Sequence, residues 1–434
     1  MKNFAALLSI LFSSFCFQAN AQWNIVKQFD SVNYKLIGGY NEKIVCLPWY
    51  SFFNPYALKR ASGDNFDFLK FADSIATGLQ EIQFISNSIG YIAGGTPYGN
   101  WNLLLKTTDG GGAWSILNTP AVSPAYSIDN VHFIDDVTGY ISDDNGNIYK
   151  TVDGGVNFTS FELPLSDKGN KFYIADLKFR NAMDGLVLLY TNVIQDSTRE
   201  VAIYITHDGA SSWQKAYYEQ IESIKNYAFY IPIQLQLVNA NIAFAMGNDG
   251  VFLKSSDGGE TWSKPNSEFN ESVTSFHFIN PNYGFASVFN KIIDTTDGGI
   301  SWTESYQNDS LSLFNYELYF PNKSKGYAIA TSSLFDNYNS YLLEIEVIDS
   351  TLSSDKNIKS QINIYPTLTK DLINLDYPYD LQVQRINLID VTGRIIRTYA
   401  KNERIITVKG IKKGIYFLNI QLKGEIITEK IIIN

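Results

Sequence analysis

Six segments of the chain share one pattern of apolar and polar positions. In each segment, aromatic and β-branched residues alternate with polar residues on both sides of a short polar turn. Alternation with a period of two is typical of a strand that buries one face, and Gly, Asn and Asp are frequent in turns. Each segment therefore predicts two antiparallel strands. The segments are residues 82–94, 131–142, 177–189, 235–247, 276–287 and 318–329.

An octet with the sequence SSDGGETW follows the fourth segment and predicts a tight turn between two further strands. Gly258 and Gly259 can adopt the positive φ angles that a two-residue hairpin turn requires. The Asp257 carboxylate and the Ser255 hydroxyl can accept hydrogen bonds from backbone N–H groups of the turn. Trp262 then begins the next strand with a large apolar ring.

The octet occurs five times, at intervals of 44, 55, 49 and 40 residues. Intervals of about 40–50 residues are typical of propeller blades with four strands. The repeated aspartates are Asp109, Asp153, Asp208, Asp257 and Asp297, and the rings that follow them are Trp114, Phe158, Trp213, Trp262 and Trp302. The octet resembles the Asp-box, or BNR repeat, of sialidases, sortilin-type receptors and photosystem II assembly-factor propellers. In those families the box is a structural turn, so the resemblance implies a fold and no active site.

The repeats predict an all-β protein with a seven-bladed β-propeller over residues 22–349. A weaker copy between residues 32 and 68 adds a seventh unit to the six segments. The last unit, residues 318–348, has three predicted strands and no box. We expect residues 23–27 to pair with residues 341–347 as its fourth strand, because closing the ring in this way removes an exposed strand edge.

The chain ends in a second unit, residues 361–434, which follows a polar linker at residues 350–360. Six or seven short alternating segments in about 75 residues predict a small C-terminal β-sandwich. The unit resembles the type A C-terminal sorting domain of the type IX secretion system. The matching motifs contain Tyr365, Pro366, Gly393, Gly414 and Tyr416, whereas Thr367 and Asn434 depart from the usual pattern. The resemblance implies export, the type IX secretion machinery as a partner, and removal of the tail.

Residues 1–21 have the features of a secretory signal peptide. Lys2 is followed by an apolar run and by Ala19-Asn20-Ala21, which predicts cleavage between Ala21 and Gln22. The run is too short for a membrane anchor, and no other stretch is expected to cross a membrane. The signal and the tail together predict a protein that is secreted or held on the outer-membrane surface of a Gram-negative bacterium.

Cysteine content and charge narrow the function further. Only Cys46 remains after cleavage, so we expect a buried thiol and no intramolecular disulfide. Residues 351–434 carry 13 basic and 8 acidic residues, whereas residues 22–350 carry 20 basic and 36 acidic residues. A net charge of −16 on the propeller argues against nucleic acid as a partner.

The boxes and histidines suggest three kinds of chemistry, and each has a simpler explanation. A calcium site needs several carboxylates at one point, but each box supplies one aspartate on a different blade. A sialidase needs an arginine cluster, but the propeller contains only Arg60, Arg180 and Arg199. His132 and His277 occupy equivalent repeat positions, and the three histidines of the chain lack metal-site spacing. We therefore expect no metal, no cofactor and no enzyme, with a divergent sialidase-like glycoside hydrolase as the alternative.

Loop length indicates a possible binding surface. The boxes join the third and fourth strands of each blade, so the connections between second and third strands lie on the opposite face. These connections are long and aromatic in three blades that adjoin once the ring closes, and they contain Trp49, Tyr50, Phe53, Tyr98, Trp101 and Tyr338. The rings either bind a ligand or only pack the loops together. We predict a monomeric binding or recognition module for an extracellular glycan or protein.

Overall fold

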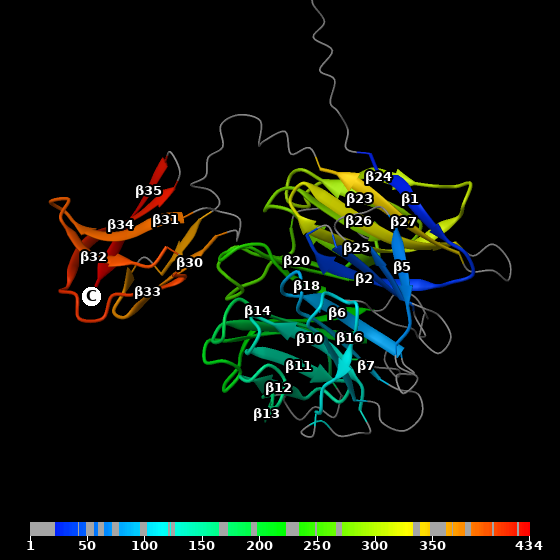
Figure 1. Ribbon diagram of the computed structural model, residues 1–434, viewed down its shortest axis with the longest axis horizontal. Helices are drawn as coiled ribbons and strands as arrows, with labels where there is room; N and C mark the ends of the chain where they lie inside the picture. Colours follow the sequence, from blue (N-terminus) through cyan, green and yellow to red (C-terminus); the bar gives the residue numbers. More distant parts are fainter. Residues whose placement is uncertain are drawn as a thin grey trace, which may run out of the picture.

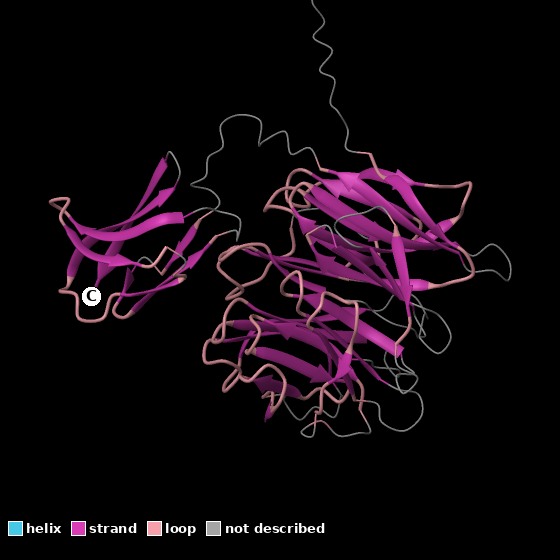
Figure 2. Ribbon diagram, viewed as in Figure 1, coloured by secondary structure: helices cyan, strands magenta, loops and turns pink. Residues whose placement is uncertain are grey.

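The computed structural model describes residues 22–41, 43–48, 56–59, 65–71, 78–95, 102–119, 122, 126–164, 172–191, 198–222, 234–247, 250–265, 271–332, 339–347, 362–366, 368–377, 383–401, 403–422 and 425–434. Within these residues the protein is all β, with strands joined by turns and loops (Figure 2). This part of the chain contains no helix, and thus none long and apolar enough to span a membrane.

The described residues between 24 and 346 form seven small antiparallel sheets, numbered along the chain (Figure 1). Sheet 1 contains β2 (Tyr34–Tyr40), β3 (Lys43–Pro48), β4 (Tyr56–Lys59) and β5 (Phe66–Leu69). Sheet 2 contains β6 (Gly78–Phe84), β7 (Gly90–Gly95), β8 (Leu103–Thr107) and β9 (Ser115–Ile116). Sheet 3 contains β10 (Ile128–Phe133), β11 (Gly139–Asp143), β12 (Ile148–Thr151) and β13 (Thr159–Phe161).

The remaining four sheets repeat this order. Sheet 4 contains β14 (Phe172–Phe179), β15 (Gly185–Thr191), β16 (Thr198–Thr206) and β17 (Gln214–Glu222). Sheet 5 contains β18 (Gln234–Leu237), β19 (Ala243–Met246) and β20 (Phe252–Ser255). Sheet 6 contains β21 (Val273–Phe278), β22 (Gly284–Val288), β23 (Lys291–Thr295) and β24 (Thr303–Gln307), and sheet 7 contains β25 (Leu313–Asn322), β26 (Lys325–Ser332), β27 (Asn339–Glu346) and β1 (Asn24–Phe29).

The first strands of the seven sheets form a closed cycle. They contact one another in the order β2, β6, β10, β14, β18, β21, β25 and back to β2. We call these seven strands the inner ring. Because each is the edge of its own sheet, its backbone N–H and C=O groups need partners from outside that sheet.

The strand expected to close the ring is present. β1 pairs antiparallel with β27, with Asn24 opposite Glu344 and Phe29 opposite Ser340. Trp23, at the start of β1, is buried edge-on against Phe285 and Phe320, with ring centroids 5.8 and 6.2 Å away. The predicted pairing of residues 23–27 with residues 341–347 is therefore confirmed as a strand pair, with residues 24–29 lying opposite residues 340–344.

Aromatic rings join neighbouring sheets on the box side of the inner ring. The last residue of an inner strand is usually Phe, and its ring lies on the glycine that opens the second strand of the same sheet. A Cβ atom on Gly139, for example, would lie 2.5 Å from the Phe133 ring. The same ring stacks on an aromatic side chain of the preceding sheet, in the pairs Tyr91–Phe133, Tyr140–Phe179 and Phe244–Phe278 at 3.4–3.7 Å. The repeated Gly-aromatic dipeptide thus serves packing between sheets.

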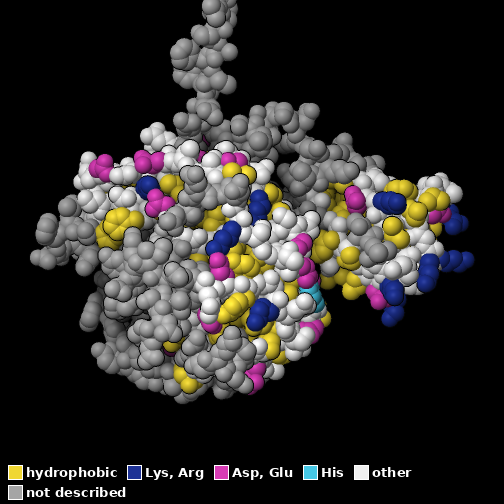
Figure 3. All heavy atoms as spheres, turned by 180° about the vertical axis from the view of Figure 1, so that it is seen from behind, with side chains coloured by type: hydrophobic (Ala, Val, Ile, Leu, Met, Phe, Trp, Pro, Cys, Tyr) yellow, Lys and Arg dark blue, Asp and Glu magenta, His cyan; other side chains and the backbone are white. Residues whose placement is uncertain are grey.

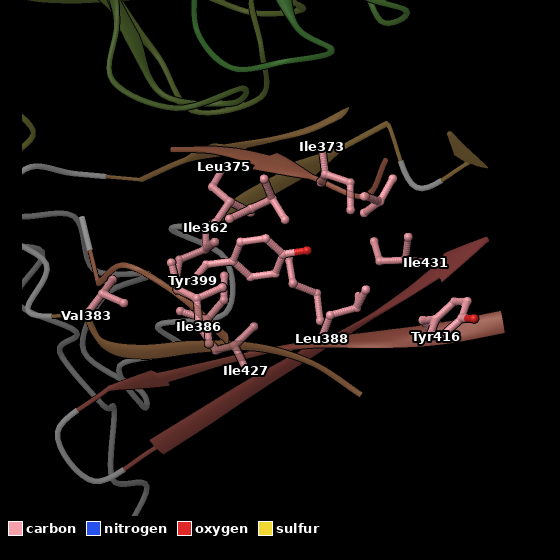
Figure 4. Packing of buried hydrophobic residues seen from close by; sticks show 14 of the residues in the cluster. Ile362, Ile373, Leu375, Val383, Ile386, Leu388, Tyr399, Tyr416, Ile427 and Ile431 are labelled. Carbon is pink, nitrogen blue, oxygen red and sulfur yellow. The ribbon is translucent and has the colours of Figure 1, made fainter. Parts of the chain in front are cut away.

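Residues 362–434 form two sheets around a core of their own. One contains β28 (Asn363–Tyr365), β30 (Leu372–Asp376) and β33 (Ile405–Thr407). The other contains β29 (Leu368–Thr369), β35 (Glu425–Ile433), β34 (Gly414–Leu422), β31 (Val383–Asp390) and β32 (Ile395–Tyr399). Ile373 and Leu375 of the first sheet face Ile386 and Leu388 of the second (Figure 4). Eight strands are present where the sequence predicted six or seven, because three of them are only two or three residues long.

Candidate functional site

The Asp-box turns follow the third strands of sheets 2 to 6, and in sheets 2, 3, 4 and 6 they lead to a fourth strand, as the sequence predicted. In the box of sheet 5, the Ser255 hydroxyl donates to Asp257 Oδ1 at 2.8 Å and accepts from the Gly259 N–H at 2.7 Å. Asp257 Oδ1 also accepts from the Thr261 N–H at 3.0 Å. Gly258 and Gly259 have φ angles of 84° and 100°. The turn is wider than the two-residue hairpin predicted from the glycine pair, because the aspartate caps a longer loop before the chain pairs again at Ser263.

The other four boxes repeat these bonds. Each Thr hydroxyl donates to the Asp two residues later, and each Asp carboxylate accepts from the backbone four residues further on. The Asn157 N–H and amide, together with the Thr151 hydroxyl, lower the pKa of Asp153 to about 2. The ring of Trp262 is buried, and its Nε1 donates to the Gly259 carbonyl at 3.0 Å. The box aspartates are thus committed to turn capping.

The predicted aromatic ligand patch lies outside the described residues. Trp49, Tyr50, Phe53, Tyr98, Trp101 and Tyr338 belong to the connections β3–β4, β7–β8 and β26–β27, all of which join second and third strands. Their role remains a prediction. Ala21 also lies outside this part of the chain, whereas Gln22 lies just before Trp23 and β1.

One described connection of the same kind contains a residue that sequence reasoning missed. Phe289, in the turn between β22 and β23, has a φ of 40° and a side chain that is 72% exposed. A bulky residue at positive φ is strained, and glycine or asparagine is the usual choice. The sequence signal for this strained residue was the dipeptide Phe289-Asn290, because Phe occupies a hairpin position that usually has glycine or asparagine.

Side chains of the inner ring bond the backbone of the next inner strand. The Gln83 amide accepts from the Phe133 N–H at 2.6 Å and donates to the Phe133 carbonyl at 3.1 Å. Gln236 makes the same two bonds to Phe278, at 2.6 and 2.9 Å. His132 Nε2 lies 2.9 Å from the Phe179 carbonyl. These contacts, which we call inter-sheet stitches, satisfy the free edges of the inner strands.

A second level of stitches lies two residues earlier, directly after a β-bulge. Glu81 Oε2 accepts from the Val131 N–H at 2.7 Å, and Asp176 Oδ2 accepts from the Leu235 N–H at 2.8 Å. The Ser275 hydroxyl accepts from the Leu318 N–H at 3.0 Å. The bulge aims each side chain at the neighbouring strand.

Charged groups meet inside the inner ring. Lys178 Nζ lies 2.7 Å from Asp176 Oδ1 and 3.2 Å from Glu81 Oε1, so it links sheets 4 and 2. Burial raises the pKa of Glu317 to about 8, with the nearby Lys35 ammonium opposing the shift and the Glu81 carboxylate adding to it. Glu317 is therefore mostly protonated at neutral pH. Burial also raises the pKa of Glu81, with the Lys178 ammonium opposing the shift.

His132 and His277 lie at equivalent positions, directly before the last Phe of β10 and of β21. Burial lowers the pKa of His132 to about 3 and of His277 to about 4, so both rings are neutral at pH 7. His207, in a box turn, has a side chain that is 53% exposed. Its Nδ1 lies 2.9 Å from Asp184 Oδ1, its Nε2 lies 3.0 Å from Glu260 Oε1, and these carboxylates raise its pKa. Figure 3 shows histidine atoms at the surface, in cyan, with acidic side chains, in magenta, beside them.

Two small cavities open beside the box-side ends of the inner strands. One, of about 270 Å³, is lined by Tyr40, Gln83, Phe84, Tyr319 and Phe320. The other, of about 240 Å³, is lined by Gln236, His277, Phe320 and Lys323. Phe320 belongs to both. Across the described ranges, no three His, Cys, Asp or Glu side chains are grouped as a metal site.

Cys46 is fully buried in sheet 1, as expected, and burial raises the pKa of its thiol. In the tail, the Tyr416 hydroxyl donates to the Lys412 carbonyl at 2.8 Å, and Gly393 has a φ of 85° in the turn after Asp390. Tyr365 and Pro366 end β28, and Gly414 begins β34. These motif residues therefore hold turns and strand ends in place.

Two family models match parts of the chain. Residues 363–434 match the secretion system C-terminal sorting domain, and residues 72–230 match the photosynthesis system II assembly factor YCF48. No curated protein sequence matches the chain.

Solved structures extend the likeness over most of the sheets. A structure titled "YCF48 bound to D1 peptide" is 14% identical, with a TM-score of 0.51, over 74% of this chain and 94% of that one. YCF48 from Cyanidioschyzon merolae is 14% identical, with a TM-score of 0.52, over 75% of this chain and 99% of that one. At this identity the likeness establishes the fold alone.

The sheets, the boxes and these matches together define an all-β propeller with repeated Asp-box turns. The chain is similar to propellers of the YCF48, or BNR-repeat, type, and it carries a C-terminal sorting domain of the type IX secretion system. A sorting domain of this class implies a secreted or cell-surface location and an interaction with that secretion system.

Proposed function

We propose that the protein is an exported, non-enzymatic binding module whose propeller recognises an extracellular glycan or protein. The supporting observation is how the polar groups of the inner ring are used. Gln83, His132, Asp176 and Gln236 each bond the backbone of a neighbouring sheet. A catalytic group must be free to meet its substrate, whereas these groups hold the scaffold together.

The architecture proposed for this module is a ring of seven blades, one for each sheet, followed by a sandwich. The closed cycle of inner strands and the pairing of β1 with β27 support the blade number. The shared core of the two tail sheets supports the sandwich. In this arrangement the tail guides the propeller across the outer membrane, and the propeller then acts as a monomer at the cell surface or after release.

The predicted patch is the first place to test ligand binding. Replacing Trp49 and Trp101 with Ala should weaken binding by about 1–3 kcal/mol each, the range of an aromatic anchor. The stability of the fold should persist, since neither residue lies in a described strand. Trp262→Ala is the matched control, because it should lower the melting temperature and leave affinity unchanged. The reverse pattern would mean that the functional face is the box face.

Binding should first be sought on a glycan array and with peptides, using the mature protein. The similar structure titled "YCF48 bound to D1 peptide" supports a polypeptide as one of the two ligand classes. The aromatic and Asn-rich composition of the three long loops supports a glycan as the other. A protein that binds neither class would contradict the proposed function.

A divergent sialidase-like glycoside hydrolase is the second candidate, favoured by one observation. Glu317 has the raised pKa of a general acid, and its charge interacts with that of Glu81. Glu81, however, is bonded to both Lys178 and the Val131 N–H. Hydrolysis of chromogenic glycosides that is lost in Glu317→Gln would establish the enzyme, and the absence of hydrolysis by the parent protein would exclude it for those substrates.

A further inference from the structure

Sheet 1 breaks the side-chain pattern of the inner ring. The inner strands of sheets 2, 3, 4 and 6 end in a large side chain followed by Phe, and that of sheet 5 ends in Gln236-Leu237. In sheet 7 the equivalent pair is Tyr319-Phe320. In β2 the equivalent positions are Gly38 and Gly39, opposite Val45 and Ile44. Two large side chains are therefore absent from one sector of the ring.

The cavity of about 270 Å³ occupies this sector. Gly38 and Gly39 are among its lining residues, which come from sheets 7, 1 and 2. A Cβ atom on Gly39 would lie 1.9 Å from the Lys43 carbonyl oxygen, so the backbone itself requires glycine there. A Cβ atom on Gly38 would meet only the Ile82 side chain, at 2.9 Å. The cavity thus results from two residues and not from loose packing.

The lining of the cavity is neutral and amphipathic. Its lining residues include the aromatic Tyr40, Phe84, Tyr319 and Phe320, and the only ionisable groups among them are the two tyrosines. Within the described part of the chain, neither tyrosine hydroxyl forms a hydrogen bond. Aromatic faces with free hydroxyls at their edges suit a ligand with an apolar face and hydroxyls at its rim.

We propose that this cavity, the sheet 1 pocket, binds one neutral sugar ring of an oligosaccharide at the box face of the propeller. The pocket is slightly smaller than the roughly 300 Å³ at which sites for drug-sized ligands begin, so it admits a single ring. The adjoining cavity of about 240 Å³ shares Phe320 and extends the site toward His277 and Lys323. The second cavity accommodates the next ring of the same oligosaccharide. This inference rests on the proposed binding function, names its ligand class, and places a site on the box face, opposite the predicted patch on the long loops.

The test measures binding of neutral tetrasaccharides of glucose, mannose, xylose and galactose to the mature full chain by ligand-observed NMR. Sialyllactose and oligogalacturonate serve as charged controls, and a hydrophobic tripeptide set serves as the alternative occupant. Gly38→Gln restores the repeat residue, and its amide should stitch to the Phe84 backbone as Gln83 does to Phe133. Gly38→Gln requires the Ile82 side chain to shift, because a Cβ atom there lies 2.9 Å from it. With the new hydrogen bonds offsetting this cost, the variant should still fold, as circular dichroism checks, and bind at least tenfold more weakly. The Tyr40→Phe, Tyr319→Phe double variant keeps both rings and should also lose tenfold or more.

The outcomes separate the pocket from the proposed function. Binding that is lost in Trp49→Ala and Trp101→Ala but kept in Gly38→Gln would overturn the pocket and leave the binding function standing. Tripeptide binding that Gly38→Gln abolishes would replace the sugar with an apolar peptide side chain. A parent protein that binds none of the neutral tetrasaccharides at millimolar concentration would overturn the sugar proposal.

Discussion

The boxes and the inner ring solve the same problem in different ways. Both must satisfy backbone groups that no strand pairs. Every box does so with the same residues, an Asp and a preceding Ser or Thr, which form the same bonds in five sheets. The inner ring does so with Gln in two sheets, His in another and carboxylates at the deeper level.

The difference lies in what each site must recognise. A box caps its own turn, so its geometry is local and a single residue combination suits every copy. An inter-sheet stitch reaches a different strand at a slightly different distance in each sector, so any side chain with a suitable oxygen or nitrogen suffices. The same residues therefore recur in every box, where the backbone partner belongs to the same turn. They vary among the inter-sheet stitches, where the backbone partner belongs to another sheet.

The largest expected effect on stability comes from breaking the closure of the ring by β1, which involves neither a box nor an inter-sheet stitch. Trp23→Ala should destabilise the propeller by about 3–5 kcal/mol, because the ring is fully buried against Phe285 and Phe320. Deletion of residues 22–29 should lower the melting temperature further, because it also opens the edge of β27. Thermal unfolding followed by circular dichroism measures both. An unchanged melting temperature in the deletion would contradict this closure.

Removing one inter-sheet stitch should lower the free energy of unfolding more than removing one box. Gln236→Ala leaves the Phe278 N–H and carbonyl without their side-chain partner, so the free energy of unfolding should fall by about 1–3 kcal/mol. Chemical denaturation measures the change. Gln220→Ala, on an outer strand, is the control and should cost less than about 0.5 kcal/mol. Equal losses in the two variants would mean that the stitches contribute nothing specific.

Breaking one box should cost about 1–2 kcal/mol, as for the loss of a helix cap. Asp257→Ala removes the acceptor for the Thr261 N–H and for the Ser255 hydroxyl. Asp257→Asn keeps one acceptor oxygen and should retain part of the stability. The comparison with Gln236→Ala is then direct, because both are measured in sheet 5. A larger loss from the box than from the stitch would reverse the expected order of the two devices.

The protonation of Glu317 predicts a smaller effect that depends on pH. Its pKa is raised from 4.5 to about 8 in the folded protein, so the folded state binds more protons between these values. Stability should therefore fall as pH rises from about 4.5 to about 8, by at most about 1.4 kcal/mol per pH unit. Glu317→Gln should flatten this slope relative to the parent. A steeper slope in the variant would contradict the assigned protonation.

The smallest effect on stability is expected from removing the tail. The hydrophobic cluster of residues 362–433 has no member from the propeller, so deletion of residues 361–434 should leave the melting temperature of the propeller unchanged. Its location should change instead, with the folded propeller retained in the periplasm. Cell fractionation measures this. Normal export of the truncated protein would contradict a sorting role for the tail.

The local features of the fold were predictable from the sequence. The alternating segments located the inner strands, the octets located the boxes, and the three-strand last unit led to the pairing of β1 with β27. The width of the box turn was not, because the Gly258-Gly259 pair also fits a two-residue hairpin. The predicted patch on the long loops remains to be tested.

The contacts within the inner ring could not be predicted. Gln83, His132 and Gln236 share a position but not a chemistry, so no motif marks them. The sheet 1 pocket could not be predicted either. Gly38 and Gly39 stand out as exceptions only when the β-bulge is used to align β2 with the other inner strands. The register of the inner strands in the folded protein, and not the type of residue, shows where the stitches and the pocket lie.

The pairing of β1 with β27 also sets a schedule for folding. In this pairing Asn24 lies opposite Glu344, and beside it the Tyr34 N–H of β2 donates to the Ser340 hydroxyl across 306 residues of sequence. The early strand β1 therefore waits for the much later strand β27. Loop closure over that span makes this the slowest native contact to form, and the six sheets between them must already be in place. A chain emerging gradually from a translocation pore would thus remain an open arc, with its earliest strand unpaired, until sheet 7 has followed it through.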